Sequence, residues 1–249
     1  MPRFFITLSY NGKNYVGWQI QPNGKSVQQM LQEAFALILR QDVAVVGAGR
    51  TDAGVHAREM IAHFDWNGDV FSPGDLMYKI NNFLPKDISL SAIKPVRPDA
   101  HARFSAISRT YKYYATTVKD PFIHEYTYRL FFQPDIGRMN ALCEVLKEYN
   151  DFTSFSRLHT DVKTNNCHIE YARWEQKGNL YEFTIRADRF LRNMVRAIVG
   201  TLLQAGRGRL DEQGFRHIIE AANRSVAGDS APGHALFLEK VIYPEDIWL

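Results

Sequence analysis

The sequence predicts an α+β fold built from two compact halves, and three observations support this class. Helical patterns of apolar residues alternate with strand patterns of period two. A hydrophobic content of 45% over 249 residues is enough to bury a sizeable core. A strand-turn-strand pattern around Gly178 and Asn179 indicates antiparallel neighbours. We therefore predict an N-terminal α+β subdomain at 1–102 and a C-terminal one at 103–249, with a similar order of strands and helices.

The apolar patterns of the first half predict six elements: a strand at 4–10, a helix from 27 to about 40, strands at 43–46 and 60–66, a helix from 73 through 84, and a strand at 88–96. The segment 26–29 (Ser-Val-Gln-Gln) resembles a capping box, which would begin the first helix. Ser72 and Pro73 would begin the second helix, because proline fits the first helical turn.

The second half predicts strands at 109–118 and 126–132, a helix carrying Met139, Leu142 and Leu146, strands at 168–175 and 180–186, helices from about 189 to 204 and from 211 to 222, and a strand at 235–243. On the long helix, Arg189, Arg192 and Arg196 are spaced by three and four residues and would share one face. Arg207 and Arg209 extend the same charge. Such a face can bind RNA, or it can be an ordinary solvated basic face.

Composition favours a cytoplasmic protein and adds little about function. No run approaches the ~20 apolar residues of a membrane span, and the first residues follow a strand pattern rather than that of a signal peptide. A formal charge of +3 is too small to prove nucleic-acid binding, because the distribution of charge decides that. Cys143 and Cys167 lack metal-ligand spacing, so we expect two reduced, buried thiols and no metal site.

The segment 49–57 (Gly-Arg-Thr-Asp-Ala-Gly-Val-His-Ala) places one carboxylate, Asp52, in a glycine-rich loop between two predicted strands. Glycine permits positive φ and close approach of the backbone to a ligand. A lone aspartate in such a turn is often structural, since it can cap a helix or close an Asx-turn. The loop by itself therefore leaves both a structural and a functional Asp52 open.

The full string GRTDAGVHA resembles the signature of the RNA pseudouridine synthases, and of the tRNA pseudouridine synthase A family in particular. Further matches follow in order along the chain: GWQ at 17–19 with Gln21, SVQ at 26–28, RTYKY at 109–113, FLRNMVR at 190–196 with GTL at 200–202, and Ala231-Pro232 with Leu236 and Leu238. Two positions depart from the pattern. Ala235 replaces an expected glycine, which puts close backbone packing at this position in doubt. His168 replaces an expected glutamine, which could alter an RNA contact.

The resemblance implies two similar α+β subdomains that share a mixed, mainly antiparallel sheet, with the active site in a central cleft. It implies an isomerase that converts uridine to pseudouridine at positions 38, 39 and 40 of the tRNA anticodon arm, and a homodimer that binds one tRNA. In this family the aspartate that matches Asp52 is catalytic, and Tyr111 stands at the position of the active-site tyrosine.

This reaction breaks the C1′–N1 bond, rotates the base and rejoins it through C5. It requires no redox change and no group donor, so we expect no small-molecule cofactor. It does require an ionised carboxylate, as a nucleophile at C1′ or a base on the 2′ hydrogen, and both roles stay open for Asp52. Because desolvation disfavours the charged form, a cation should lie nearby. We favour Arg196, since Arg50 shares a face with Asp52 only in an extended loop, and we assign Arg50 to RNA binding or loop organisation.

The side chains of Tyr111 and His56 each have more than one interpretation. Tyr111 would stack on the target base, since a base pulled out of its helix needs an aromatic platform. From composition alone it could instead be a core residue of a β-rich run. His56 lies close to Asp52 in the sequence, but isomerisation does not clearly need a second base, so we favour loop packing or a phosphate contact.

Two classes of function remain open at this point. The favoured one is a pseudouridine synthase that acts on tRNA. The second is a non-catalytic RNA-binding module, which would use the basic residues and Tyr111 but would not need Asp52 with an arginine partner. A metal-dependent nuclease is disfavoured, because the sequence contains no cluster of carboxylates, histidines or cysteines at ligand spacing.

Overall fold

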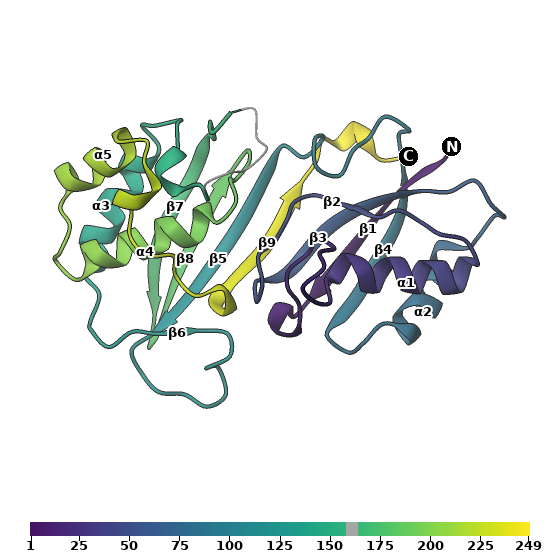
Figure 1. Cartoon of the computed structure of the whole chain (residues 1–249), viewed down its shortest axis with the longest axis horizontal. Coiled ribbons are helices and arrows are strands. Elements are labelled where there is room, and N and C mark those ends of the chain that lie inside the picture. The colour runs from purple at the N-terminus through teal and green to yellow at the C-terminus, as the bar shows by residue number, and fades with distance from the viewer. Residues whose placement is uncertain (158–163) are drawn as a thin grey trace. The chain divides into compact units, whose positions relative to one another are not determined.

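The computed structural model describes residues 1–157 and 164–249 (Figure 1). Contacts divide the chain into two compact units, Met1–Ile107 with Leu238–Leu249, and Ser108–Phe237. The sequence-based division at 102 and 103 differs in two respects: the first unit continues to Ile107, and the C-terminal segment belongs to it rather than to the second half. That segment joins the first unit because its backbone pairs there: the Leu249 N–H donates to Pro95.

The sheet of the first unit has β1 (Arg3–Tyr10) between β3 (His56–Asp65) and β4 (Ile88–Val96), both antiparallel to it. β9 (Leu236–Ile242) enters this unit at Leu238, and a short β2 (Val46–Gly47) pairs with β3. The strand predicted at 43–46 is wrong for most of its length. The backbone N–H and C=O of Val45 bond to glutamine side chains of the preceding helix instead of a strand.

That helix, α1 (Val27–Leu39), and α2 (Pro73–Phe83) begin where the sequence predicts. The Ser26 hydroxyl accepts from the Gln29 N–H at 3.2 Å, which satisfies one donor of the first turn. In a full capping box the Gln29 side chain would also accept from the Ser26 N–H. Here the Gln29 amide donates to Glu33 instead, so only half of the capping box forms. Ser72 caps α2 in the same way, with Pro73 at its first position.

In the second unit β8 (Leu180–Ala187) pairs antiparallel with β5 (Ser108–Thr116) on one side and with β7 (Ile169–Lys177) on the other. Gly178, at a φ of 61°, makes the turn of the β7–β8 hairpin. A two-residue β6 (Tyr128–Arg129) runs parallel to β5, so the strand predicted at 126–132 is much shorter than expected. The α+β class, with mainly antiparallel pairing, is confirmed.

Three helices lie beside β7 and β8 in Figure 1: α3 (Ile136–Leu146), α4 (Met194–Gly206) and α5 (Glu212–Glu220). The helix predicted from about 189 begins only at Met194, because Asn193 adopts a left-handed conformation with a φ of 68°. Arg189 and Arg192 therefore precede the helix. The prediction that they share one helical face with Arg196 is wrong.

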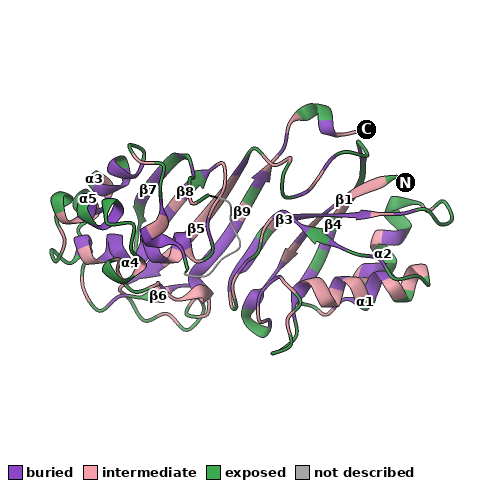
Figure 2. Cartoon of the chain, turned by 45° about the horizontal axis from the view of Figure 1, so that its top comes forward, coloured by how far each residue is buried: buried purple, intermediate pink, exposed green. Residues whose placement is uncertain are grey.

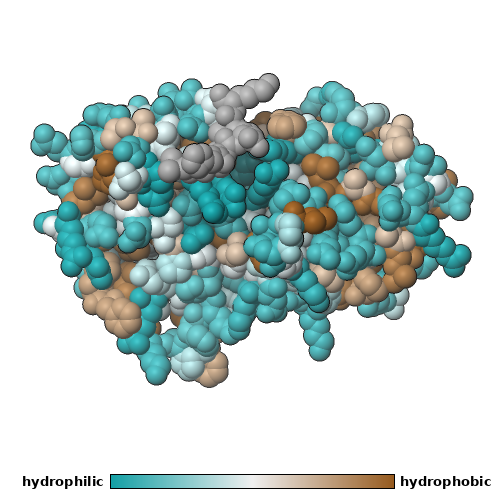
Figure 3. Space-filling view, viewed as in Figure 1, coloured by the Kyte–Doolittle hydropathy of each residue, from teal (hydrophilic) through white to brown (hydrophobic). Residues whose placement is uncertain are grey.

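The cores consist mainly of large aromatic and branched side chains, and nearly every residue of α4 is buried (Figure 2). The backbone of Asp229 can approach α4 closely because Gly200 has no side chain. A Cβ at Gly200 would lie 1.8 Å from the carbonyl oxygen of Asp229. On the surface shown in Figure 3, hydrophilic side chains predominate and apolar ones form small patches. Among the helices of the described chain, none has the length and apolar character needed to cross a membrane.

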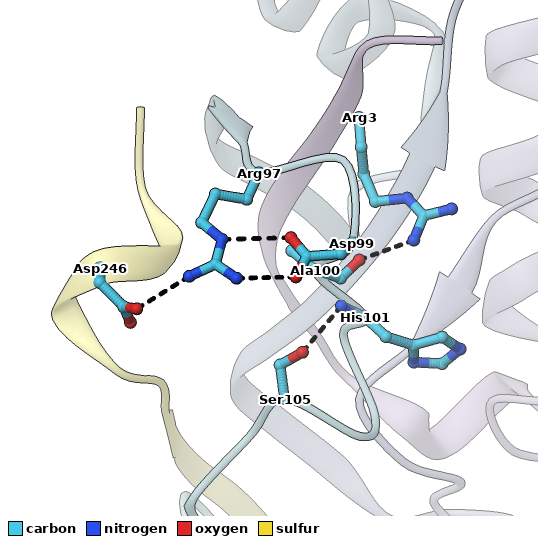
Figure 4. Close-up of polar contacts among 7 residues, drawn as sticks. All are labelled: Arg3, Arg97, Asp99, Ala100, His101, Ser105 and Asp246. Carbon is cyan, nitrogen blue, oxygen red and sulfur yellow. Dashed lines mark hydrogen bonds and ion pairs between the residues drawn. The ribbon is translucent and has the colours of Figure 1, made fainter.

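A polar cluster fastens the segment that follows β4 in the first unit (Figure 4). The Arg97 guanidinium donates to both carboxylate oxygens of Asp99 and, at 2.8 Å, to Asp246 near the C-terminus. Arg3 on β1 donates to the carbonyl of Ala100 at 2.7 Å while it pairs with Asp65 on β3. The segment after β4 is thus fixed to both the sheet and the C-terminal residues.

Candidate active site

Asp52 lies at the start of a tight turn that leads into β3. The N–H of Val55 donates to the carbonyl of Asp52 at 3.1 Å, and Gly54 occupies the third position of the turn with a φ of 76°. A type II turn requires positive φ at that position, which glycine adopts without strain. The Asp52 side chain is half-buried. The glycine pattern of the sequence therefore has a local cause, which is the turn that presents this carboxylate.

A second backbone segment holds the loop from the other side. Gly17 and Asp52 form an isolated antiparallel bridge, and the N–H of Trp18 donates to the carbonyl of Thr51 at 3.1 Å. Gly17 has a φ of 115°, and a Cβ at this position would lie 2.5 Å from the Thr51 carbonyl oxygen. Only glycine fits so close an approach. The GWQ match in the sequence thus supports the Asp52 loop.

Buried polar contacts anchor both ends of the loop to the sheet. The hydroxyls of Thr51 and Tyr10 are 2.8 Å apart and both residues are buried. At the other end, His56 Nδ1 accepts from the Gly12 N–H at 3.0 Å, and this histidine is also buried. Of the two roles predicted for His56, the structure shows loop packing. Because buried hydrogen bonds are costly to leave unmade, these contacts restrict how far the backbone around Asp52 can move.

Arg50 is exposed, and its Nε donates to Gln19 Oε1 at 3.2 Å. The Gln19 amide in turn donates to Gln28 on α1 at 2.9 Å, and Gln28 donates to the Val45 carbonyl at 2.8 Å. This chain of contacts links the Asp52 loop to the first turn of α1. The sequence did not predict it, because the bonded residues lie far apart along the chain and no periodic pattern marks them.

In the second unit, Tyr111 lies on β5 with its ring half-buried. The Tyr111 ring packs edge to face against the Phe190 ring, with the ring centroids 5.2 Å apart and the ring planes at 88°. Two positions along the same strand, Tyr113 is fully buried. The alternative of a core tyrosine therefore applies to Tyr113, whereas Tyr111 keeps part of its surface accessible.

Arg196 lies in the first turn of α4 and is fixed by the segment that follows Ser230. Its Nε donates to the carbonyl of Ala231 at 2.7 Å, and the N–H of Ala231 donates to the carbonyl of Arg196 at 2.9 Å. One residue earlier in the segment, Ser230 accepts from the Asn193 side chain at 2.6 Å. In the sequence Ala231 is only part of a family match, and nothing there indicates that it orients Arg196.

The remaining predicted arginines occupy different places in the second unit. Arg189 is half-buried and Arg192 exposed, both in the segment between β8 and α4. Arg207 follows the last turn of α4, where its guanidinium carbon lies 4.2 Å from the ring centroid of Phe132. The structure thus gathers Arg189, Arg192 and Arg196 near the start of α4 and places Arg207 at the other end.

Both departures from the family pattern are accommodated. Ala235 is fully buried at the end of a short 3-10 helix, Gly233–Ala235, so the methyl group finds room there. His168 is exposed, and its backbone N–H donates to Asp188 at 2.7 Å. The same Asp188 oxygen accepts from the Arg189 N–H, which fixes the start of the arginine-bearing segment independently of the His168 side chain.

Both cysteines are buried free thiols, as predicted, and burial raises the pKa of Cys167 to about 12. Within residues 1–157 and 164–249, no three His, Cys, Asp or Glu side chains gather in a way that could hold a metal ion.

Comparison with known proteins gives a consistent result over the whole chain. The family model described as tRNA pseudouridine synthase matches residues 6–105 and 149–244. The tRNA pseudouridine synthase A of Parabacteroides distasonis is 63% identical over 251 residues, covering 100% of this chain and 98% of that protein. That of Bacteroides thetaiotaomicron is 59% identical, covering 100% and 93%. A more distant relative, tRNA pseudouridine synthase A 2 of Clostridium perfringens, is 37% identical, covering 96% and 98%.

Proposed function

This chain belongs to the tRNA pseudouridine synthase family, and from that premise we propose that it isomerises uridine to pseudouridine at positions 38, 39 and 40 of the tRNA anticodon arm. The observation that carries the proposal is the Asp52 loop, in which a turn and a bridged glycine segment present one carboxylate on a restrained backbone. A reacting group must be held within a narrow range of positions to act efficiently.

Asp52 would supply the reacting carboxylate. As a nucleophile it would attack C1′ and form a bond to the sugar while the C1′–N1 bond breaks. As a base it would take the 2′ hydrogen and return it after the base has turned. In both cases C1′ then joins C5, and in the nucleophilic route the bond between C1′ and the Asp52 carboxylate breaks as this happens. The C5 proton is lost and N1 is protonated, so atoms and charge balance without a cofactor.

Arg196 is proposed as the cation that keeps this carboxylate ionised once the RNA excludes water. Its guanidinium is already oriented by Ala231, which reduces the conformational entropy lost when it acts. Arg50 is proposed to organise the loop through Gln19 and to contact RNA with its remaining donors.

Tyr111 is proposed as the platform for the displaced uracil. Its half-buried ring is supported edge to face by Phe190, so it can offer a preformed stacking surface. Arg189, Arg192 and Arg207 are proposed to bind phosphates of the tRNA. We further propose a cytoplasmic homodimer that binds one tRNA across its two subunits.

The decisive test is Asp52→Asn, which removes the negative charge but keeps the size and hydrogen-bonding ability of the side chain. Pseudouridine formation in a tRNA transcript should fall below detection. Folding and tRNA affinity should persist, because removing an anion cannot cost electrostatic attraction to phosphates. The matched control is Asp69→Asn, which changes an exposed aspartate outside the Asp52 loop, and it should behave as wild type.

A folded Asp52→Asn protein that still converts uridine would refute the mechanism. Wild-type protein that binds tRNA without converting it would favour the RNA-binding module. Mapping pseudouridine in RNA from cells with and without this protein would test the target positions.

A further inference from the structure

Two arginine–phenylalanine pairs and a further arginine lie at the surface of the second unit, and we call this group the Arg–Phe patch. It consists of Arg129 with Phe131, Phe132 with Arg207, and Arg209, which follows Arg207 by two residues. The guanidinium carbon of Arg129 lies 5.0 Å from the ring centroid of Phe131, and that of Arg207 lies 4.2 Å from the centroid of Phe132. Two stacked cation–aromatic pairs therefore involve neighbouring phenylalanines, with one arginine contributed from elsewhere in the sequence.

Local backbone structure builds this patch. Leu130 is buried, and its N–H donates to the Thr116 carbonyl at 2.7 Å as the chain leaves β6. The residues on either side of Leu130, Arg129 and Phe131, are both exposed. Further on, the N–H of Asp135 donates to the carbonyl of Gly206 at 3.0 Å, which fastens this segment to the end of α4 beside Arg207.

The charges of the patch are not neutralised by the protein. Arg129, Arg207 and Arg209 are exposed, and none pairs with a carboxylate in the part of the chain that the structure describes. Neighbouring Arg138, in contrast, pairs with Asp135 at 3.3 Å. Phe131 is also 80% exposed, although burying a phenylalanine is favourable. Guanidinium groups without a carboxylate, beside an exposed ring, match a partner that carries both negative charge and flat aromatic groups.

Arg207, the C-cap residue of α4, lies on the same side of this helix as Arg196. The two residues are separated by about three helical turns, or about 16 Å along the axis. Three whole turns return a side chain to its starting direction. A folded RNA that contacts Arg196 would therefore reach the Arg–Phe patch a few nucleotides away from the reacting uridine.

We propose that the Arg–Phe patch binds an unpaired nucleotide of the tRNA outside the reacting position, which rests on the proposed function for the identity of the RNA. The base stacks on the open face of Phe131 or Arg129, and Arg207 and Arg209 contact the adjacent phosphates. RNA fits better than a second copy of this chain. A two-fold interface centred on the patch would bring its three arginines against the same three on the partner.

The test measures the equilibrium binding of a tRNA transcript to protein that also carries Asp52→Asn, so that turnover does not intervene. Phe131→Ala should weaken binding about tenfold, equivalent to about 1.4 kcal/mol for the removal of one stacked base. Phe131→Trp keeps an aromatic face and should retain wild-type affinity. Phe122→Ala is the matched control, because Phe122 is 89% exposed in the same unit and no arginine stacks on it in the described chain.

The salt dependence of tRNA binding tests whether the arginines of the patch contact phosphates. Arg129→Ala should lower the slope of log affinity against log salt by about 0.7 for each phosphate that the variant no longer neutralises. Arg173→Ala, which removes an exposed arginine from β7, should leave the slope unchanged. Circular dichroism should show all these surface variants folded, since none removes a buried side chain.

Three outcomes would overturn the inference. Unchanged affinity and salt slope in both Phe131→Ala and Arg129→Ala would show that RNA does not reach the patch. A Phe131→Ala protein that sediments as a smaller species, with weaker RNA binding only at low protein concentration, would identify a subunit interface instead. Loss of affinity in Phe131→Trp as large as in Phe131→Ala would exclude stacking.

Failure of this inference can be separated from failure of the proposed function. If wild-type protein forms pseudouridine and Phe131→Ala binds tRNA normally, the proposed role of the patch is rejected and the proposed enzymatic function stands. Weakened binding in Phe131→Ala combined with an inactive wild type would leave an RNA surface on a protein that is not a synthase.

Discussion

Arg196 and Ala231 are joined by two hydrogen bonds, one from the arginine side chain at 2.7 Å and one from the alanine N–H at 2.9 Å. The first turn of α4 and the segment before β9 therefore hold this guanidinium in one direction. A cation that is oriented before the substrate binds can stabilise a negative charge with little reorganisation.

Replacing Arg196 by lysine should show that orientation matters as well as charge. Arg196→Lys keeps the positive charge but has no Nε–H to donate to Ala231. We expect kcat to fall about tenfold or more, because small displacements of a reacting group are costly, while tRNA affinity changes less than about threefold. Single-turnover kinetics separate the two effects. Equal losses in kcat and in affinity would show that Arg196 mainly binds RNA.

Tyr111 should act through its ring. Tyr111→Phe keeps the stacking surface and the packing against Phe190, whereas Tyr111→Ala removes both. Turnover should therefore be far lower in Tyr111→Ala than in Tyr111→Phe. If both variants are equally crippled, the hydroxyl handles a proton. Wild-type activity in both would eliminate the assignment.

The arginines after α4 should set part of the salt dependence of tRNA binding. Replacing Arg207 and Arg209 together by alanine should weaken all tRNAs to a similar degree, since phosphate contacts carry no sequence information. The slope of log affinity against log salt should fall by somewhat under one unit for each phosphate that is no longer neutralised. Measurements with several tRNA transcripts over a range of salt concentrations would reveal an unchanged slope if these residues lie outside the RNA surface.

His63 should make the first unit less stable in mild acid. It is only 5% exposed, and burial, followed by the charges of Arg3 and His101, lowers its pKa to about 4. The unfolded histidine titrates near 6.5, so between about pH 4 and 6.5 the unfolded chain binds the extra proton. Stability contributed by neutral His63 is thus complete above about pH 6.5 and is lost as pH falls toward 4.

The expected loss from this group is about 1–2 kcal/mol between pH 7 and pH 5. Urea unfolding of wild type at the two pH values measures it. His63→Asn removes the titrating group, so its stability should vary less with pH over this range. His124→Asn, which changes an exposed histidine, should keep the wild-type difference. An identical pH dependence in His63→Asn would show that other groups are responsible.

Gly200→Ala should be strongly destabilising, because the new methyl group would clash with the backbone of Asp229. A cost of about 2–4 kcal/mol is expected for overpacking against a backbone that other bonds hold in place. Gly74→Ala is the matched helical control: its Cβ would meet only Ser72 Oγ at 3.9 Å, and it should be neutral or slightly stabilising. Thermal unfolding of both variants would decide, and similar melting temperatures would contradict the proposed clash.

The elements that the sequence predicted well have local causes. Ser26 and Ser72 cap helices within three residues of themselves, and β4 follows its apolar alternation from Ile88 to Val96. The prominence of Asp52 also has a local cause, since Gly54 sits where the turn needs positive φ.

The features that were missed depend on conformation or on distant residues. The start of α4 was misplaced because Asn193 takes a left-handed conformation that periodicity does not encode. The two strands that proved short, around Val45 and after Arg129, leave the sheet for partners elsewhere in the chain. The Arg207–Phe132 pair joins residues that only the fold brings together.

The return of Leu238–Leu249 to the first unit has a consequence for synthesis on the ribosome. The second unit is one continuous stretch of chain, so it can complete its core while the first unit still lacks its last strand. The N-terminal residues leave the ribosome first, but their unit can complete its fold only after residues 238–249 have been made. Until those residues are made, the strand edge that they cover stays open to pairing with other chains, which favours aggregation.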